Sequence, residues 1–273
     1  MGREGAALTK GRVYDAPMTW SAKQYVAFED ERTRPVRDLL AAVPDGYGGR
    51  VIDLGCGPGN STEILNAKLS TARISGIDSS SDMIEAARKR LPHLEFSVGD
   101  IAAWRDPGPF DVILANAVLH WLPDHAALFP ALLAKLAPGG ALAVQMPDNL
   151  DEPTHRLMRE IAMTGPWAAK LGCAAGSRTV LNDAAWYFDV MRPRAARVDL
   201  WRTTYYHQLA GGAAAVVEWF KGSGLRPFLQ PLAAGEQSAY LERYTAAISR
   251  VFPARSDGSV LLPFPRLFMV AIR

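Results

Sequence analysis

Between residues 50 and 145, short apolar segments alternate with segments whose apolar residues recur at helical spacing. The pattern predicts strands at residues 50–54, 73–77, 95–98, 110–115 and 141–145. It predicts helices at residues 61–69, 81–91 and 126–136. The fourth strand is largely apolar, as expected of a central strand that is covered on both faces. Strand–helix repeats of this length predict an α/β fold with a doubly wound, mostly parallel sheet.

The second half of the chain is less regular. Helical spacing continues at residues 153–171, 213–221 and 235–252, and β-forming residues are concentrated at 197–209 and 261–272. We interpret the last two segments as strands that pair antiparallel at one edge of a seven-stranded sheet. The helices between them are expected to form a cap over the site, inserted before the last strand. Residues 172–194 offer only a glycine-rich stretch and a helix near 182–191.

The composition narrows the classes of partner. Thirty Lys and Arg residues against 28 Asp and Glu residues leave a net charge of +2, which gives no electrostatic reason to expect nucleic acid or an anionic membrane. No apolar run reaches the ~18 residues of a spanning helix. Cys56 and Cys173 make neither a disulfide framework nor a Cys-x-x-Cys metal pair. We expect a cytoplasmic protein without a metal site, and nothing in the sequence argues against a monomer.

The most specific local feature is the glycine loop from Asp53 to Ser61, which leaves a predicted strand and opens a helix. Glycines allow a sharp turn there and let a ligand approach the backbone where a Cβ atom would collide. A dinucleotide-binding loop requires Gly or Ala at position 60, where this chain has Asn60, and the third glycine, Gly59, comes one residue early. Asp53 also favours a ligand with an ammonium group over a pyrophosphate, which its charge would repel.

Two further acids follow the next strands. Asp78 closes the second predicted strand, where a carboxylate can accept both hydroxyls of a ribose. Asp100 follows the third strand and is placed to accept a hydrogen bond from an adenine amino group. Each has an ordinary alternative, because Asp78 could cap the helix that begins near Ser81 and Asp100 could be a turn aspartate. Three acids beside successive strand ends, together with the glycine loop, are harder to explain by capping and turns.

The segments 51–59 (VIDLGCGPG), 76–78 (GID) and 99–100 (GD) resemble the motifs of class I methyltransferases, which use S-adenosylmethionine and have a Rossmann-like fold. The residues that the resemblance implies around the methionine part of this cofactor are Asp53, Gly55 and Gly57. Those that it implies at the ribose and adenine are Asp78, Met83, Asp100 and Ile101. Further cofactor contacts that we expect are Tyr25, Arg34, Gly59, Asn60, Ser79 and Asn116. These motifs are specific for the cofactor but not for the substrate.

A closer resemblance extends from residue 19 over nearly the whole chain. The segments that carry it are 31–35 (ERTRP), 115–125 (ANAVLHWLPDH), 145–149 (QMPDN), 201–207 (WRTTYYH), 224–228 (GLRPF) and 263–268 (PFPRLF). They are similar to a family of carboxyl methyltransferases that esterify one carboxylate of trans-aconitate. The resemblance implies the same reaction here, with trans-aconitate or a close polycarboxylate as the small-molecule substrate.

The organisation of the chain follows from the same comparison of segments. Residues 1–18 have no counterpart in this family and no apolar segment typical of a secretory signal, so we expect a flexible leader, or a start placed too early with Met18 as the true start. Residues 19–148 are expected to hold a lid helix, with Tyr25 and Arg34, and the cofactor-binding half. Residues 149–273 are expected to hold the helical cap, the substrate-binding segments and the final strands of the same domain.

A carboxylate is already ionised at neutral pH, so methyl transfer to it from a sulfonium requires no general base. The protein mainly aligns the reactants and excludes water. Methyltransferases that act on amides or adenine amines typically carry an Asn/Asp-Pro-Pro-Tyr/Phe stretch after the fourth strand, where this chain has residues 116–120 (NAVLH). We therefore predict no catalytic base.

His120 and Trp121 lie just past the carboxyl end of the fourth strand, where ligands bind in open α/β sheets. His120 either orients a substrate carboxylate by donating to it or is a packed histidine beside Trp121. The acid also needs cations, and arginine is suited because its planar fork pairs with a carboxylate through two hydrogen bonds. The candidate cations are Arg32, Arg34, Arg202, Arg226 and Arg266.

Strand alternation separates the side chains of residues 197–209. Arg202 and Tyr206 share one face, whereas Tyr205 lies on the other, so the segment cannot point into one pocket without a bulge. Arg202 could equally be a solvated surface charge, whereas Arg266, in an otherwise apolar run, is less suited to the surface. We retain all four residues as candidate substrate contacts.

Three other interpretations of the sequence stay open. The protein could methylate another small acid or a hydroxylated metabolite with the same cofactor. It could bind the cofactor without catalysis. It could be a nicotinamide-dependent oxidoreductase, although the glycine spacing argues against this last class.

Overall fold

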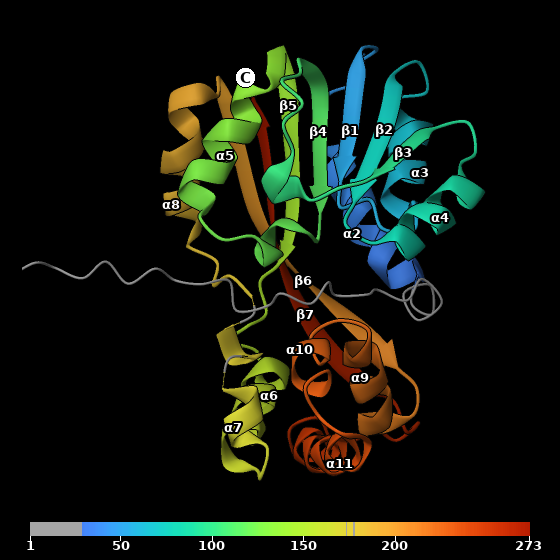
Figure 1. Ribbon diagram of the computed structural model, residues 1–273, viewed down its shortest axis with the longest axis vertical. Coiled ribbons are helices and arrows are strands. Elements are labelled where there is room, and N and C mark those ends of the chain that lie inside the picture. Colours follow the sequence, from blue (N-terminus) through green and yellow to red (C-terminus); the bar gives the residue numbers. More distant parts are fainter. Residues whose placement is uncertain (1–28, 173, 177) are drawn as a thin grey trace, which may run out of the picture.

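A computed structural model describes residues 29–172, 174–176 and 178–273, which form a sheet flanked by helices and a helical lobe at one end of it (Figure 1). The seven strands follow the order β3-β2-β1-β4-β5-β7-β6. Their bounds are β1 (Arg50–Leu54), β2 (Arg73–Asp78), β3 (Glu95–Val98), β4 (Phe110–Asn116), β5 (Leu136–Pro147), β6 (Arg197–Leu209) and β7 (Val260–Ile272).

The helices fall into two groups, those on the sheet and those of the lobe. The helices on the sheet are α2 (Glu29–Ala41), α3 (Asn60–Lys68), α4 (Ser81–Arg90), α5 (His125–Ala134) and α8 (Ala184–Met191). The lobe holds α6 (Pro153–Thr164), α7 (Ala168–Leu171), α9 (Gly212–Lys221), α10 (Arg226–Leu229) and α11 (Ala234–Val251). Short 3-10 turns are η1 (Ile101–Ala103), η2 (Leu119–Trp121), η3 (Ala174–Gly176) and η4 (Arg192–Arg194).

The pairing of the strands confirms the predicted fold class. The first five strands are parallel to their neighbours, and β7 lies antiparallel between β5 and β6. Pairing of β7 with β5 ends where Arg266 meets Pro147, whereas its pairing with β6 continues to the Leu209–Val260 pair. The last two strands therefore leave the sheet as a two-stranded ribbon and carry the lobe beyond the carboxyl ends of the parallel strands (Figure 1).

Alternation along the strands gives the sheet an apolar layer on each face. On one face α5 and α8 bury residues such as Phe129 and Tyr187 against β4, β5 and β7. On the other face α2 and α3 bury residues such as Leu39 and Leu65. The lobe has a core of its own, in which α6, α9 and α11 pack aromatic side chains such as Phe220 against the amino end of β7.

Two predicted boundaries are wrong. The strand predicted at residues 141–145 begins earlier, because β5 starts at Leu136 and pairs with β4 across a register shift between Phe110 and Val112. Gly140 fits there because a Cβ atom would lie 2.8 Å from the carbonyl oxygen of Phe110. The predicted helix at 153–171 is divided into α6 and α7, since it is interrupted at Gly165, where a Cβ atom would meet the ring of Trp167 at 2.2 Å.

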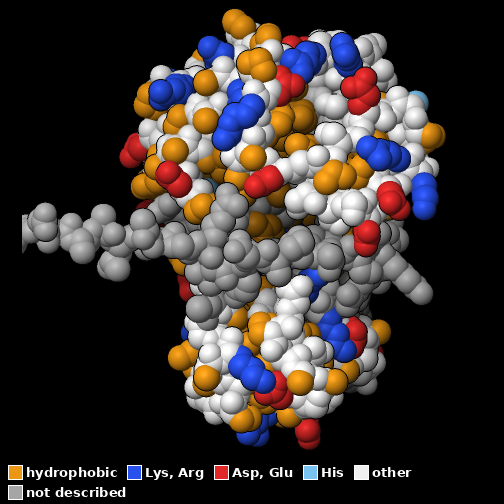
Figure 2. All heavy atoms as spheres, viewed as in Figure 1, with side chains coloured by type: hydrophobic (Ala, Val, Ile, Leu, Met, Phe, Trp, Pro, Cys, Tyr) orange, Lys and Arg blue, Asp and Glu red, His pale blue; other side chains and the backbone are white. Residues whose placement is uncertain are grey.

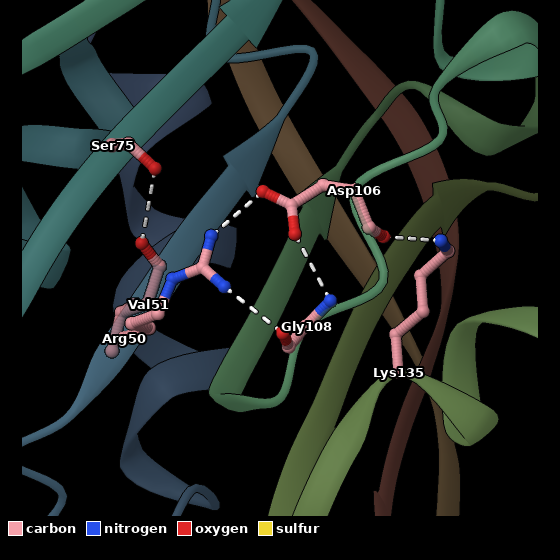
Figure 3. A network of polar contacts seen from close by, with 6 residues as sticks. All are labelled: Arg50, Val51, Ser75, Asp106, Gly108 and Lys135. Atoms are coloured by element: carbon pink, nitrogen blue, oxygen red, sulfur yellow. Dashed lines mark hydrogen bonds and ion pairs between the residues drawn. The ribbon is translucent and has the colours of Figure 1, made fainter.

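A polar network fastens the loop before β4 at the end of the sheet opposite the lobe (Figure 3). Arg50 donates to Asp106 Oδ2 at 2.7 Å and to the carbonyl oxygen of Gly108 at 3.2 Å. Lys135 donates to the carbonyl oxygen of Asp106, and Gly108 N donates to Asp106 Oδ1 at 2.9 Å. These contacts hold the amino ends of β1 and β4 together, so the two strands reach the other end of the sheet in register.

Charged side chains of both signs are scattered over the face seen in Figure 2, on the sheet and the lobe alike. In the described part of the chain, no helix is long and apolar enough to cross a membrane. The predicted leader at 1–18, the lid residue Tyr25 and Cys173 lie outside the described residues.

Candidate functional site

The loop between β1 and α3 adopts the sharp turn expected of its glycines. Gly55, Gly57 and Gly59 have φ values of 69°, 54° and 90°, which disfavour other residues. A Cβ atom at Gly55 would lie 2.4 Å from Val118 Cγ2. The backbone of this loop can therefore line a pocket only because glycine stands at position 55.

The main part of the site is a pocket at the carboxyl ends of β1, β2 and β4, with about 790 Å³ of empty space that is partly open to solvent. The predicted cofactor residues that line it are Gly55, Gly57, Asp78, Ser79, Met83, Asp100, Ile101 and Asn116. The structure adds Gly99, Ala117, Val118 and Leu122, and it places Trp121, a predicted substrate contact, in the same wall. Each added residue is a near neighbour in the sequence of a predicted one. This closeness along the chain is the signal by which the sequence could have indicated them.

Asp78 and Asp100 both line the pocket and both accept hydrogen bonds from backbone nitrogens. Asp78 accepts hydrogen bonds from the backbone nitrogens of Gly57 at 3.0 Å and Ser80 at 2.9 Å. It is not the N-cap of α4, because that residue is Ser80. Asp100 is the N-cap of η1 and accepts from Ala102 N at 2.9 Å. A carboxylate has about four acceptor positions, so both side chains can accept further hydrogen bonds from a ligand.

Asp53 lies beneath the pocket rather than in its wall. Its side chain is completely buried, and Oδ2 accepts from the hydroxyls of Ser61 and Thr62, both at 2.7 Å. Within the described part of the chain, Oδ1 has no hydrogen-bond partner. Burial raises the pKa of Asp53 to about 7, and its two hydroxyl partners only partly oppose this shift. The residue is thus placed to act on a bound cation through charge and to fix the start of α3.

Gly59 and Asn60 also lie outside the wall of the large pocket. Gly59 packs against α4, since a Cβ atom there would lie 3.3 Å from Ala87 Cα. Asn60 lines a smaller hollow on the other side of the loop, together with Val36 and Asn116. Their contribution to cofactor binding stays a prediction.

His120 is buried where β4 ends, and its ring lies 4.9 Å from that of Trp121. Burial and the nearby charges of Arg178 and Arg266 hold the pKa of His120 well below its usual value, so the ring is neutral at pH 7. Nδ1 is buried and finds no hydrogen-bond partner among the described residues. The histidine is therefore packed, as one interpretation held, and also keeps a ring nitrogen available for a ligand.

Arg266 is only 5% exposed, as expected from its apolar surroundings in the sequence. Nη1 donates to Gln145 Oε1 at 3.1 Å, and the guanidinium lies over the rings of Phe264 and Tyr205. Arg34 also contacts Tyr205, because its guanidinium lies over the Tyr205 ring at 5.3 Å from the ring centre. The structure therefore brings Arg34 to the predicted substrate residues and not to the wall of the cofactor pocket.

The side chains of Arg202 and Tyr206 lie on the face of β6 opposite to that of Tyr205. They share the exposed face of β6, as the alternation predicted, and Tyr206 is 63% exposed. Arg202 Nε pairs with Asp148 Oδ2 at 2.8 Å. Tyr205, on the opposite face, is buried and donates its hydroxyl to Asp38 at 2.6 Å. Among the other candidate cations, Arg226 lies in α10 of the lobe, and the side chain of Arg32 lies outside the described part.

The sequence analysis missed Arg178, which lies in the segment left without an assignment. Its guanidinium donates to Asn149 Oδ1 at 3.0 Å, to His155 Nε2 at 3.1 Å and to the carbonyl oxygen of Pro147 at 3.1 Å. It also lies 5.7 Å from the ring centre of Trp121. The sequence held one indirect signal, because Asn149 belongs to a segment that carries the family resemblance.

The described residues contain no group of three or more His, Cys, Asp or Glu side chains that could hold a metal ion. Taken together, the site is an apolar pocket that has the carboxylates of Asp78 and Asp100 at one end. The arginines Arg178 and Arg266 lie beyond Trp121 at the other end.

Comparison with known proteins decides the family. Residues 27–210 match the family model described as a methyltransferase domain. A trans-aconitate 2-methyltransferase of Azoarcus sp. (strain BH72) is 54% identical over 93% of this chain and 99% of its own length. That of Rhizobium meliloti (strain 1021) is 53% identical over 94% of this chain and 99% of its own length. The chain belongs to the trans-aconitate 2-methyltransferase family.

Solved structures support the fold at lower similarity. Phosphoethanolamine N-methyltransferase 2 of Haemonchus contortus, in complex with S-adenosyl-L-methionine, has a TM-score of 0.52 and 14% identity, covering 88% of this chain and 52% of its own. The YcgJ protein from Bacillus subtilis has a TM-score of 0.55 and 11% identity, covering 89% and 98%. Membership of the methyltransferase family agrees with the sheet order and with a pocket at the carboxyl ends of the strands.

Removal of the Asp78 carboxylate is expected to weaken binding of S-adenosylmethionine about tenfold or more, because hydrogen bonds to a charged group are worth roughly 1.5–3 kcal/mol. The dissociation constant of Asp78→Ala is measured by calorimetry beside that of Asp82→Ala, which removes an exposed carboxylate from the first turn of α4. Asp82→Ala is expected to bind normally. An unchanged dissociation constant for Asp78→Ala would remove the assignment of this carboxylate to the ribose.

Affinity for S-adenosylmethionine is expected to rise with pH, because the cationic methionine part favours ionised Asp53. Since the pKa of Asp53 is about 7, the carboxyl is mostly neutral at pH 6 and mostly ionised at pH 8. The gain over this interval is at most about tenfold. Dissociation constants at pH 6, 7 and 8 test this, and Asp53→Asn, neutral at every pH, should remove the slope. A wild-type affinity that is flat or falls with pH contradicts the role of Asp53.

Proposed function

We propose that the protein transfers a methyl group from S-adenosylmethionine to one carboxylate of trans-aconitate, forming a monomethyl ester. Relatives with this name are 51–54% identical over more than nine-tenths of the chain. The structural observation that carries the substrate class is Arg266, a buried guanidinium at the carboxyl end of the sheet next to His120. A cation there suits an anionic acid better than a hydroxylated or amine acceptor.

The pocket fits the cofactor in three respects. The backbone at Gly55 lies so close to Val118 that no Cβ atom fits there. Asp78 and Asp100 present acceptors at two neighbouring strand ends, while Met83 and Ile101 offer apolar contact for a base. Asn116 Oδ1 is buried, and within the described residues it has no hydrogen-bond partner, so it is available to a donor on a ligand.

When bound, S-adenosylmethionine would supply a methyl group on a positively charged sulfur: a bond from a carboxylate oxygen to the methyl carbon would replace the carbon–sulfur bond, the neutral thioether would leave, and no proton would be lost. The protein's residues therefore need to orient and to exclude water rather than to move protons. Trp121 and Leu122 form the apolar wall between the pocket and the arginines. His120 is neutral at pH 7, so one of its ring nitrogens carries a proton that it can donate to a carboxylate.

The remaining parts of the proposal concern partners and location. The nearly balanced net charge supports a small-molecule partner over nucleic acid. A cytoplasmic location and a monomeric state remain predictions from the sequence.

The reaction is tested by incubating purified protein with S-adenosylmethionine and trans-aconitate, with citrate and cis-aconitate as controls. Mass spectrometry is expected to detect a monomethyl ester of trans-aconitate and little ester of the controls. Binding of S-adenosylmethionine is measured in parallel. Tight cofactor binding without any ester would overturn the assignment of the substrate and favour a binding module.

Arg266→Ala is expected to raise the KM for trans-aconitate about tenfold or more, because one charged contact to a carboxylate is lost. The dissociation constant for S-adenosylmethionine is expected to stay within about twofold, since Arg266 does not line the cofactor pocket. Steady-state kinetics and calorimetry on the same preparation separate the two effects. If neither constant changes, Arg266 has no part in binding the acid.

A further inference from the structure

Arg178 carries a charge that the surrounding protein offsets only in part, since Asp148 affects its pKa less than burial and the charges of Arg159 and Arg266 do. The acceptors of its hydrogen bonds, Asn149 Oδ1, His155 Nε2 and the carbonyl oxygen of Pro147, are all neutral. His155 accepts through Nε2, and burial with nearby arginines keeps its pKa well below the usual value, so it adds no charge. Among the described residues, no carboxylate lies within ion-pair distance of Arg178. A guanidinium in this position attracts an anion from outside the protein.

Other cations and donors surround the same place. Burial and the charges of Arg159 and Arg266 lower the pKa of Arg178 to about 10, so Arg178 and Arg266 are close enough to repel each other. The buried side-chain nitrogens that have no hydrogen-bond partner among the described residues include Arg178 Nε, His120 Nδ1 and Gln145 Nε2. Gln145 already accepts from Arg266, and His120 feels the charges of both arginines. The group offers hydrogen-bond donors and positive charge, which is the complement of a carboxylate.

The segment that carries Arg178 is fastened to the wall of the cofactor pocket. Thr179 N donates to the carbonyl oxygen of His120 at 3.0 Å, and Thr179 Oγ1 donates to that of Leu122 at 2.7 Å. The Arg178 guanidinium lies over Trp121, which faces the pocket. Arg178 is therefore held at a fixed place beyond the methyl-transfer region and not on a freely moving side chain.

We propose that Arg178 binds a carboxylate of the substrate other than the one that is methylated, and thereby selects tricarboxylates over acids that lack that carboxylate. The inference rests on the proposed function, because it concerns the acid bound at the same site. Arg266 contributes charge from the neighbouring strand, so a substrate with several carboxylates satisfies both arginines at once. An acid that lacks the carboxylate held by Arg178 leaves this guanidinium buried without a counter-charge, and its binding is weaker for that reason.

The test compares three acids on wild type and Arg178→Gln. They are trans-aconitate and two dicarboxylates, cis-glutaconate and mesaconate, each of which lacks one of its three carboxyl groups and keeps the geometry of the other two. Arg178→Gln is expected to raise the KM for trans-aconitate about tenfold or more, with kcat and the dissociation constant for S-adenosylmethionine within about twofold. For the dicarboxylate that lacks the carboxylate held by Arg178, kcat/KM is expected to be the same in both proteins within about twofold.

Two further variants separate binding from a structural role. Arg178→Lys keeps the charge and is expected to recover part of the KM, although not the paired hydrogen bonds. Arg197→Gln removes an exposed arginine of β6 that pairs with Asp199, and it is expected to behave as wild type. If Arg178→Gln lowers kcat/KM for all three acids equally, the residue only supports the fold. If the KM for trans-aconitate is unchanged, the inference is wrong.

Failure of the proposed function gives a different result. Wild type would then form no ester from trans-aconitate, whatever residue stands at position 178. In that case calorimetry with S-adenosylhomocysteine present measures binding of trans-aconitate to wild type and Arg178→Gln directly. Binding that is about tenfold weaker in the variant supports an anion site at Arg178 without methyl transfer, and equal binding, or none to wild type, overturns it.

Discussion

Backbone pairing of β7 with two antiparallel neighbours holds the two parts of this molecule together. Over Arg266–Ile272 the strand pairs on both sides, and beyond Arg266 it pairs with β6 alone. The change occurs at the carboxyl end of β5, where the chain also turns into α6 and the lobe. Arg266 therefore lies at the junction of the sheet, the lobe and the site, and its place is set by the ladder of backbone hydrogen bonds rather than by side-chain packing.

Burial of two like-charged arginines near one another costs free energy that the surrounding side chains only partly offset. Neutral acceptors such as Gln145 and Asn149 satisfy some of the N–H groups without cancelling the charge. The aromatic faces of Phe264 and Trp121 add a weak attraction for the guanidinium groups. Under the proposed function, an anion that binds here would offset the remaining cost, so the arrangement that is unfavourable in the free protein would favour ligand binding.

The sequence was sufficient wherever a local pattern determines the structure. Strand–helix alternation predicted the sheet, and the glycine loop with Asp78 and Asp100, together with the resemblance to class I methyltransferases, predicted most of the residues that line the large pocket. Period-two alternation placed Tyr205 inside and Tyr206 outside correctly. Local patterns failed where tertiary contacts decide. The strand predicted to begin at residue 141 begins at Leu136 and includes Gly140, and Asp53, expected beside the cofactor, is covered by Ser61 and Thr62.

Arg178 shows a second kind of failure. Nothing in its neighbourhood along the chain distinguishes it from a surface arginine, because its partners come from β5, α6 and η2. Only a sequence comparison that linked position 178 with Asn149 or His155 would have drawn attention to it. Arg34 was assigned both to the lid and cofactor and to the candidate cations for the acid, and only the structure, in which it contacts Tyr205, distinguishes between these roles.

The lobe helices α9 to α11 enter and leave through adjacent strands, and the Leu209–Val260 pair closes their base. Their two connections to the rest of the chain are thus neighbours in space, which is the arrangement in which whole segments are exchanged or lengthened most easily in evolution. A related chain could replace these helices with others of different length without rethreading the sheet or moving the glycine loop. The acceptor side of such an enzyme can diversify while its methyl-donor side stays the same.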